Sequence, residues 1–232
     1  VMTCENLCES ELCLYDIDGA RLQESYMMLD NINRNCNKGR ASLKTYLGVE
    51  NRKEALRGAD FVVNAIQVGG YEPSTVIDFE IPKKYGLRQT IADTLGIGGI
   101  MRTLRTIPVL EDFAREMEEV CPNAWFLNYT NPMAMLTGYM LRYTGVKTVG
   151  LCHSVQVCSE HLLESLDMKE FLEGRRELIA GINHMAWLLE IRDKNGNDLY
   201  PEIRRRALQK NDTEQHNDMV RFEYIRRLGY YC

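Results

Sequence analysis

Short apolar runs alternate along this chain with longer stretches in which apolar residues recur at helical spacing. A short apolar run between polar turns is typical of a buried strand, and apolar residues three or four positions apart are typical of an amphipathic helix. Alternation of the two predicts βαβ units and a parallel sheet. Strands are predicted at residues 11–16, 43–47, 60–67, 124–129 and 147–152. Helices are predicted at residues 19–34, 51–57, 74–85, 99–120, 132–143 and 154–166.

The pattern changes after Gly174. Residues 177–193, ELIAGINHMAWLLEIRD, predict two strands with a bend at Asn183 and His184, and the following KNGND predicts a turn. From Tyr200 to its end the chain is highly charged and predicts helix.

The two patterns together predict a doubly wound, Rossmann-like α/β fold with a parallel sheet. We place this domain at residues 1–173 and the start of an α+β substrate and metal domain at residues 174–232. A length of 232 residues with 45% hydrophobic content is sufficient for a sizeable buried core.

Composition narrows the function classes. A net charge of −5 and the lack of a basic block argue against nucleic-acid binding. No run approaches the roughly 20 apolar residues that cross a bilayer, and the opening VMTCENLCES does not resemble a secretion signal. The eight cysteines form no paired CxxC motifs, so we expect reduced thiols and a cytoplasmic protein. Cys13, Cys36 and Cys121 are expected to act as small core residues.

Ligands of an open parallel sheet bind beyond the carboxyl ends of its strands. Asp16 ends the first predicted strand, where an acidic residue can hold the ribose of a dinucleotide; alternatively, Asp18 caps the next helix and Asp16 is merely exposed. Asn131 follows the strand at 124–129 and offers either an amide to a sugar hydroxyl or a helix cap. Cys152 and His153, both of residue types that bind metals, stand side by side at the end of the last of these strands.

A dinucleotide-binding fold opens with a strand and a GxGxxG turn, about 20 residues before that acidic residue. Only fifteen residues precede Asp16, and none of them is glycine. The glycines of GIGG at 96–99 come too late and lack the spacing. Either there is no dinucleotide, or the chain begins inside the fold, after its first strand and glycine-rich loop. The parallel sheet favours the second interpretation.

Four motifs, in order, carry a resemblance to one family: TIADTLGIGGIMRTLRTIP at 90–108, LNYTNPMAM at 127–135, GLCHSVQ at 150–156 and AGINHMAWLLE at 180–190. The chain resembles the NAD- and manganese-dependent glycosidases of glycoside hydrolase family 4 over its whole length. Within that family it looks like the α-galactosidase branch. The family is an exception to the two-carboxylate rule of glycoside hydrolysis.

The resemblance implies a redox route to hydrolysis. NAD⁺ takes a hydride from C3 of the sugar, a base removes the acidified proton on C2, and the group on C1 is eliminated. Water then adds, and the NADH returns its hydride to C3. A divalent metal, Mn²⁺ in the family, polarises the C3 carbonyl and holds the C2 oxygen. The implied partners are a small-molecule glycoside and further copies of the chain in a homo-oligomer, with no membrane and no nucleic acid.

The resemblance also implies roles for individual residues. It places the metal on Cys152 and His184, with sugar hydroxyls and water completing an open shell. Thiolate is an unusual ligand for manganese, so the choice of Mn²⁺ rests on the family. Asn131 is expected to bind the sugar near C3. His153 stands where some members carry a general acid, although many of them have Asp there. Asp93 matches an acidic position that strengthens the catalytic base; alternatively, it caps a short helix. That base is expected beyond the printed chain.

Other classes stay open from the residues alone. A lactate- or malate-type NAD-dependent hydroxy-acid dehydrogenase shares the fold, and Arg102 and Arg105 on one helix could imitate its substrate clamp. The chain as printed is also consistent with an inactive fragment of the glycosidase. Among glycosides, a galactoside, a glucoside and a galacturonide all stay open, and the CHSVQ form leans toward an α-galactoside. The lack of a basic cluster argues against a 6-phospho sugar.

Overall fold

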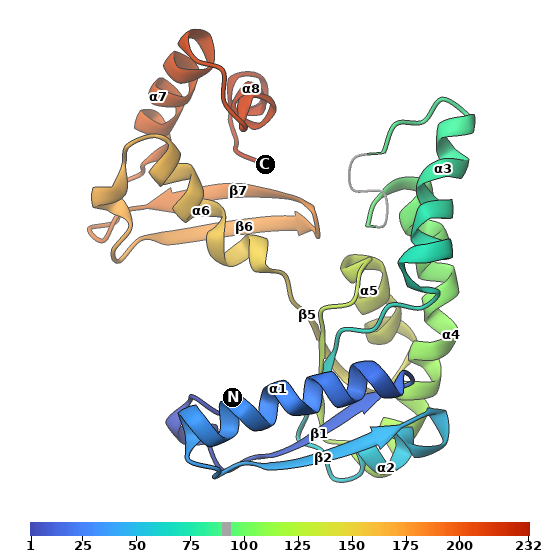
Figure 1. Cartoon of the computed structure of the whole chain (residues 1–232). Helices are drawn as coiled ribbons and strands as arrows, with labels where there is room; N and C mark the ends of the chain where they lie inside the picture. Colours follow the sequence, from blue (N-terminus) through green and yellow to red (C-terminus); the bar gives the residue numbers. More distant parts are fainter. Residues whose placement is uncertain (90–93) are drawn as a thin grey trace. The chain divides into compact units, whose positions relative to one another are not determined.

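A computed structural model describes residues 1–89 and 94–232 of the chain (Figure 1). The chain divides into two compact units. Unit 1 comprises Val1–Val68, Arg105–Asn128 and Thr137–Val149, and unit 2 comprises Gly69–Leu104, Tyr129–Leu136 and Gly150–Cys232. The division into sequence domains at 173/174 stays a prediction.

The parallel strands belong to unit 1. β1 (Glu11–Asp16) pairs in parallel with β2 (Ser42–Leu47). β3 (Phe61–Asn64) pairs in parallel with β4 (Trp125–Asn128), and β5 (Lys147–Gly150) lies on the other side of β4. Within the described residues the strand orders are thus β1-β2 and β3-β4-β5. The pairs β1–β2 and β3–β4 are both parallel, and helices alternate with the strands along the chain, so the predicted Rossmann-like α/β fold is confirmed.

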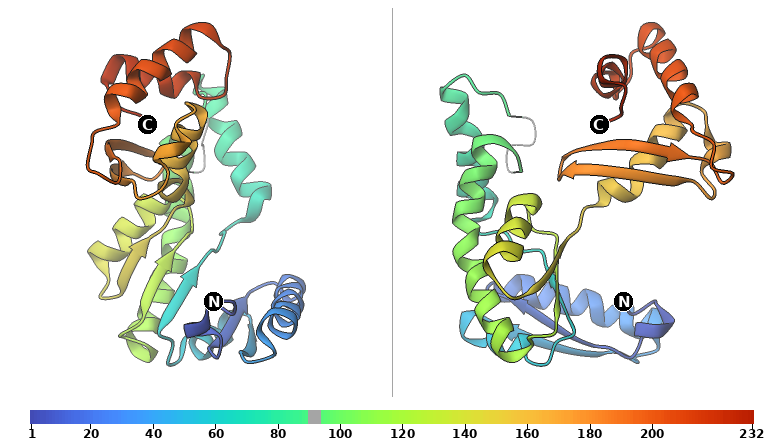
Figure 2. Two further views of the ribbon diagram at one scale, coloured as in Figure 1. Left: turned by 90° about the vertical axis from the view of Figure 1, so that its left-hand side faces the viewer. Right: turned by 180° about the vertical axis from the view of Figure 1, so that it is seen from behind.

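Helices cover the β1–β2 pair. α1 (Gly19–Asn37) begins after Asp18, whose Oδ1 accepts hydrogen bonds from the amides of Ala20 and Arg21 at 2.9 and 3.1 Å. An acid in this position satisfies two of the free amides at the start of a helix. α1 lies along β1 and β2, and α2 (Arg52–Leu56) contacts the same two strands (Figure 2).

Buried polar groups join the ends of β3 and β4. Asn64 Nδ2 donates to Oδ1 of Asn128 at 2.9 Å, and Asn128 Nδ2 donates to Oγ1 of Thr137 at 3.1 Å. The prediction that this strand runs to residue 67 is wrong, because β3 stops at Asn64, opposite the last residue of β4. The remaining helices before β5 are α3 (Val76–Lys84), α4 (Gly96–Val120) and α5 (Met133–Tyr143). Short helical segments lie at Glu5–Leu7, Val49–Asn51, Gly70–Thr75 and Lys169–Phe171.

The C-terminal part of unit 2 is an antiparallel hairpin with helices. β6 (Arg176–Ile182) pairs with β7 (Met185–Arg192), so the predicted bend at residues 183–184 is confirmed. α6 (His153–Ser165) precedes the hairpin, and α7 (Tyr200–Thr213) and α8 (Met219–Leu228) follow it. The prediction of helix from Tyr200 to the end is correct for both helices but misses the break between them, where the polar residues EQHND stand.

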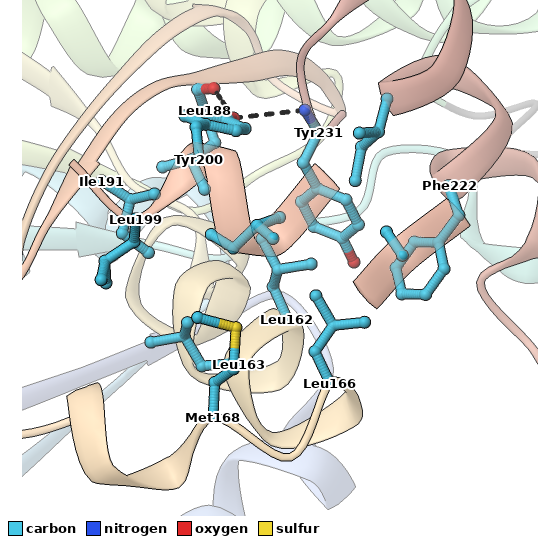
Figure 3. Packing of buried hydrophobic residues seen from close by; sticks show 13 residues of the cluster. Leu162, Leu163, Leu166, Met168, Leu188, Ile191, Leu199, Tyr200, Phe222 and Tyr231 are labelled. Carbon is cyan, nitrogen blue, oxygen red and sulfur yellow. Dashed lines mark hydrogen bonds between the residues drawn. The ribbon is translucent and has the colours of Figure 1, made fainter. Parts of the chain in front are cut away.

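A hydrophobic cluster fills the space between this hairpin and its helices (Figure 3). Its buried members are Leu162, Leu163, Leu166, Met168, Leu188, Ile191, Leu199, Tyr200, Ile203, Ala207, Phe222, Ile225 and Tyr231. The Tyr200 hydroxyl donates to the carbonyl of Leu188 and accepts from the amide of Tyr231 at 3.3 Å. The amide of Leu188 in turn donates to the carbonyl of Tyr231 at 3.0 Å. These hydrogen bonds hold Tyr231 against β7.

Two of the cysteine predictions are wrong. Cys121 is buried as expected, but Cys13 and Cys36 are exposed. In β1 the side chains alternate between the faces of the strand, so Leu12 and Leu14 are half-buried on one face while Cys13 points to the other. All eight cysteines are free thiols, and no helix among the described residues is long and apolar enough to cross a bilayer.

Candidate functional site

Cys152 occupies the N-cap position of α6 and is half-buried. Its backbone is extended, with φ −145° and ψ 140°, and its side chain makes no capping hydrogen bond. The thiol therefore stands at the positive end of a helix without being used to cap it. A metal-bound cysteine is a thiolate, and a helix N-terminus stabilises that negative charge.

His184 lies at the tip of the β6–β7 hairpin, in the turn between the paired residues Ile182 and Met185. Its φ of +43° is a left-handed value that is uncommon outside glycine. The strands approach closely beside it: a Cβ on Gly181 would lie 2.5 Å from the Cα of Ala186. Glycine is therefore required at position 181, and the tight turn holds the half-buried imidazole at the hairpin tip.

A second segment of unit 2 contacts the His184 ring. Oγ1 of Thr94 lies 3.1 Å from Nδ1 of His184, and Thr94 is buried. Thr94 directly precedes the LGIGG sequence that opens α4. Sequence reasoning missed this residue, although it stands inside the motif at 90–108.

The donors suit a divalent metal in an open site. Thiolate sulfur and imidazole nitrogen are ligands that divalent transition metals accept. Beside His184, Oδ1 of Asn183 is buried and has no hydrogen-bond partner in the described part of the chain. No group of three or more His, Cys, Asp and Glu side chains gathers within residues 1–89 and 94–232, so these residues form no closed structural cage. A catalytic metal keeps positions open for substrate, and this donor set is compatible with one.

His153 is the first residue of α6 and is exposed. Its ring lies 5.6 Å from the ring of Tyr129, with 34° between the two planes. This contact restricts the imidazole while leaving it accessible to solvent, which suits a group that delivers a proton. Tyr129, in the LNYTNPMAM motif, was not singled out from the sequence.

Asn131 is half-buried just before α5. Its Oδ1 accepts a hydrogen bond from the amide of Met133 at 3.4 Å, which is long for a cap. The side-chain amide can therefore serve a ligand as well as the helix start, and both interpretations of this residue stand.

Asp16 belongs to unit 1, at the end of β1. Its carboxylate accepts two hydrogen bonds from Arg21, both at 2.7 Å, and one from the amide of Asp18 at 2.9 Å. The Arg21 guanidinium lowers the pKa of Asp16 below its ordinary value. Asp18 caps α1 as the alternative expects, but Asp16 is paired rather than merely exposed. Arg21 in the first turn of α1, five residues after Asp16, is the sequence signal for this pairing.

The predicted residues thus fall into two groups. Unit 2 carries Asn131, Cys152, His153 and His184, whereas Asp16 lies in unit 1. Asp93 lies outside the described residues.

A cavity of about 460 Å³ lies elsewhere, on α7 and α8. Its lining residues are Asn211, Met219, Val220, Glu223, Tyr224 and Arg227. Glu223 is paired with Arg226 and Arg227 at 3.0 and 2.7 Å, and no predicted site residue contributes to the lining. The cavity is therefore not the candidate site.

Comparison with known proteins decides the family. The Family 4 glycosyl hydrolase profile matches residues 1–168, and the profile of the Family 4 glycosyl hydrolase C-terminal domain matches residues 179–232. The chain belongs to glycosyl hydrolase family 4. The resemblance carried by the four sequence motifs is confirmed.

Individual members of family 4 support this assignment. An alpha-galactosidase from Bacillus subtilis (strain 168) is 64% identical over 221 residues, which cover 95% of this chain and 49% of that protein. A 6-phospho-alpha-glucosidase from gut microorganisms, solved in complex with NAD and glucose-6-phosphate, matches with a TM-score of 0.79 at 25% identity, covering 96% of this chain and 50% of that one. A 6-phospho-beta glucosidase from Thermotoga maritima, solved with manganese, NAD⁺ and glucose-6-phosphate, shares the fold with a TM-score of 0.77 at 21% identity, covering 95% and 50%.

The family assignment favours the glycosidase over the hydroxy-acid dehydrogenase. The proposed arginine clamp gains no support either, because Arg102 is buried and Arg105 Nε donates to the carbonyl of Val68 at 3.2 Å. The chain spans about half the length of the alpha-galactosidase that it matches.

Proposed function

We propose that this chain belongs to an α-galactosidase that cleaves α-glycosidic bonds by the NAD- and metal-dependent route. The observation that supports it most directly is the pair of metal-ligand types in unit 2: Cys152 at an unused helix N-cap and His184 at a strained hairpin tip. The 64% identity to the Bacillus subtilis alpha-galactosidase supports the choice of an α-galactoside over a glucoside or a galacturonide.

Each residue of the candidate site has its own role in this proposal. When bound, NAD supplies reversible hydride transfer at C3. A divalent metal, for which Mn²⁺ is the first choice, polarises the oxygens at C2 and C3. Cys152 and His184 hold the metal, and the amide of Asn131 hydrogen-bonds the sugar near C3. His153 protonates the leaving oxygen on C1, since its ring is accessible at the start of α6.

Two acidic residues complete the assignment. The carboxylate of Asp16, at the end of a Rossmann strand, accepts hydrogen bonds from the ribose hydroxyls of NAD. Its Arg21 partner is 62% exposed, so the guanidinium can swing aside or share the carboxylate with the ribose. Asp93 strengthens the catalytic base.

We further propose a cytoplasmic homo-oligomer. The eight free thiols suit a reducing compartment. The exposed apolar side chains of Met27 and Met28 on α1, 61% and 62% exposed, suit contact with another copy.

The test is an assay of the protein that contains this chain with an aryl α-galactoside, in the presence and absence of NAD⁺ and Mn²⁺. Turnover is expected to require both, and deuterium at C2 or C3 of the sugar is expected to slow it, because those bonds break. Cys152→Ser is expected to abolish turnover, whereas Cys158→Ser, a half-buried cysteine on the same helix, keeps it. Turnover that needs no NAD⁺ and shows no isotope effect at either carbon points instead to a two-carboxylate glycosidase.

A further inference from the structure

Thr94 contacts the Nδ1 edge of the His184 imidazole. Oγ1 of Thr94 lies 3.1 Å from Nδ1, so Nε2 is the ring nitrogen left for a ligand. A neutral imidazole carries one proton, and a nitrogen that binds a metal must be the one without it. The partner of the other nitrogen then decides both the tautomer and the direction of the ring.

We propose that Thr94 is a positioning residue for His184: its hydroxyl oxygen accepts the Nδ1–H and thereby presents the Nε2 lone pair to the divalent cation. The inference rests on the proposed function for the cation and on the hydrogen bond for the geometry. It assigns to Thr94 no contact with metal, NAD or sugar.

Burial makes this bond effective. Thr94 is 4% exposed, so water competes little for its hydroxyl, and a hydrogen bond in such a place fixes orientation better than one at the surface. His184 is held at a φ of +43°, a conformation that the surrounding contacts must maintain. The bond to Thr94 is one of those contacts, since it joins the hairpin tip to the segment before α4.

The backbone of Thr94 packs against the start of α4. A Cβ on Gly99 would lie 2.8 Å from the carbonyl carbon of Thr94, so glycine at this position lets the first turn of α4 pack directly on the Thr94 backbone. Gln89 ties the same region together: its Oε1 accepts from the amide of Gly98 at 3.0 Å and its Nε2 donates to the carbonyl of Asp78 at 2.9 Å. The backbone of Thr94 is thus held against the first turn of α4.

The first experiment reads the tautomer without any metal. Long-range ¹H–¹⁵N NMR of the metal-free chain is expected to show the His184 proton on Nδ1. Thr94→Val, which removes the hydroxyl at nearly constant volume, is expected to shift the ring toward the Nε2–H tautomer, and Thr94→Ser is expected to restore Nδ1–H. The matched control is Thr148→Val, a buried threonine on β5 whose hydroxyl donates to the carbonyl of Val146, just before the strand, at 3.1 Å. It is expected to leave the His184 tautomer unchanged.

The second experiment measures Mn²⁺ affinity by electron paramagnetic resonance of the free ion. Thr94→Val is expected to weaken binding about 10- to 100-fold, the usual effect of removing the partner of a metal-bound histidine, and Thr94→Ser to recover most of it. A wild-type ring protonated on Nε2 overturns the proposal by itself, even if the variants fail to fold. Unchanged affinity in Thr94→Val, with His184→Ala weakened, overturns it as well. If Mn²⁺ binds to none of the proteins, including wild type, the proposed function loses its metal site, while the NMR result still decides the role of Thr94.

Discussion

The parallel-strand region of unit 1 and the C-terminal region from α6 to Tyr231 both bury hydrophobic side chains, but they differ in the polar groups that they bury beside them. The C-terminal region surrounds one cluster of aliphatic and aromatic side chains. Unit 1 buries hydrophobic side chains such as Leu110 and Phe126, but it also buries polar ones: Asn37 and Asn128 are 0% exposed and Arg52 is 5% exposed. At the same time Phe61 and Val63 of β3 stay largely exposed.

Each of these buried polar groups in unit 1 has a defined partner. Arg52 forms two hydrogen bonds to Glu116 at 2.8 and 2.9 Å, which raise the pKa of its guanidinium, and Asn37 Nδ2 donates to the carbonyl of Cys8 at 2.7 Å. A hydrocarbon interior loses stability in proportion to the cavity that a truncation leaves. A paired polar interior loses stability because the remaining partner is left unsatisfied. The two regions should therefore respond to different substitutions.

The largest effect is expected in the C-terminal cluster. Phe222 is 0% exposed, and Phe222→Ala is expected to lower the free energy of unfolding of this region by about 3–5 kcal/mol, because a large cavity opens. The chain has two tryptophans, Trp125 on β4 and Trp187 on β7, so each region has its own fluorescence reporter. Denaturant unfolding in Trp125→Phe and Trp187→Phe backgrounds separates the two transitions.

The Trp187 transition is expected to move to lower denaturant while the Trp125 transition moves less. Val220→Ala, on the same helix but 68% exposed, is the control and is expected to change little. Equal shifts of both transitions in Phe222→Ala would show that the two regions unfold as one and would remove the basis of the comparison.

A smaller effect is expected from the polar interior of unit 1. Asn128→Ala removes the acceptor of Asn64 and the donor to Thr137, and is expected to cost about 1–3 kcal/mol, read from the Trp125 transition. Exposed Asn123 on the loop before β4 gives the control Asn123→Ala, expected to stay within about 0.5 kcal/mol of wild type. An Asn128→Ala protein as stable as wild type would mean that these hydrogen bonds contribute nothing to the region.

The smallest effect on stability is expected from Tyr200, and it appears only at alkaline pH. Burial raises its pKa from 10.0 to about 12, and burial also raises the pKa of Tyr231. The folded protein therefore holds the Tyr200 proton more tightly than the unfolded chain. This contribution to stability is fully present below pH 10 and is lost as the pH rises toward about 12.

Unfolding followed by Trp187 over that pH range is expected to show a steeper loss of stability in wild type than in Tyr200→Phe. Part of the loss is expected to remain, because Tyr231 still titrates in the same direction. Tyr85→Phe, at a position that is 79% exposed, is expected to follow the wild-type profile. Identical slopes in wild type and Tyr200→Phe would contradict the alkaline sensitivity assigned to this hydroxyl.

The elements were predictable from the sequence where local signals agree. The apolar run ELCLYD became β1 at residues 11–16, and Asp18 capped α1 as an acid before a helix should. The hairpin tip at His184 followed from the strand pattern on either side of it. The end of β3 could not be predicted in the same way, because it depends on where its neighbour β4 ends, far along the chain.

The contacts around the site were less predictable than its residues. Cys152, His153 and His184 were named from motifs, but the hydrogen bond from His184 to Thr94 joins residues 90 positions apart. The packing of Tyr129 on His153 likewise depends on two separate segments meeting in space. No local pattern contains such a pairing. The Arg21 bond to Asp16, five positions apart, was within reach of sequence reasoning.

The metal site is tested most directly by cobalt absorption. Co²⁺ added to the reduced chain is expected to produce a sulfur-to-metal charge-transfer band in the near ultraviolet, because a cysteine thiolate is one of its ligands. Cys152→Ser is expected to abolish the band and His184→Ala to weaken Co²⁺ binding, while Cys158→Ser, on the same helix, keeps wild-type absorption and affinity. A band that persists in Cys152→Ser, or that disappears in Cys158→Ser instead, would contradict the assignment of Cys152 as a metal ligand.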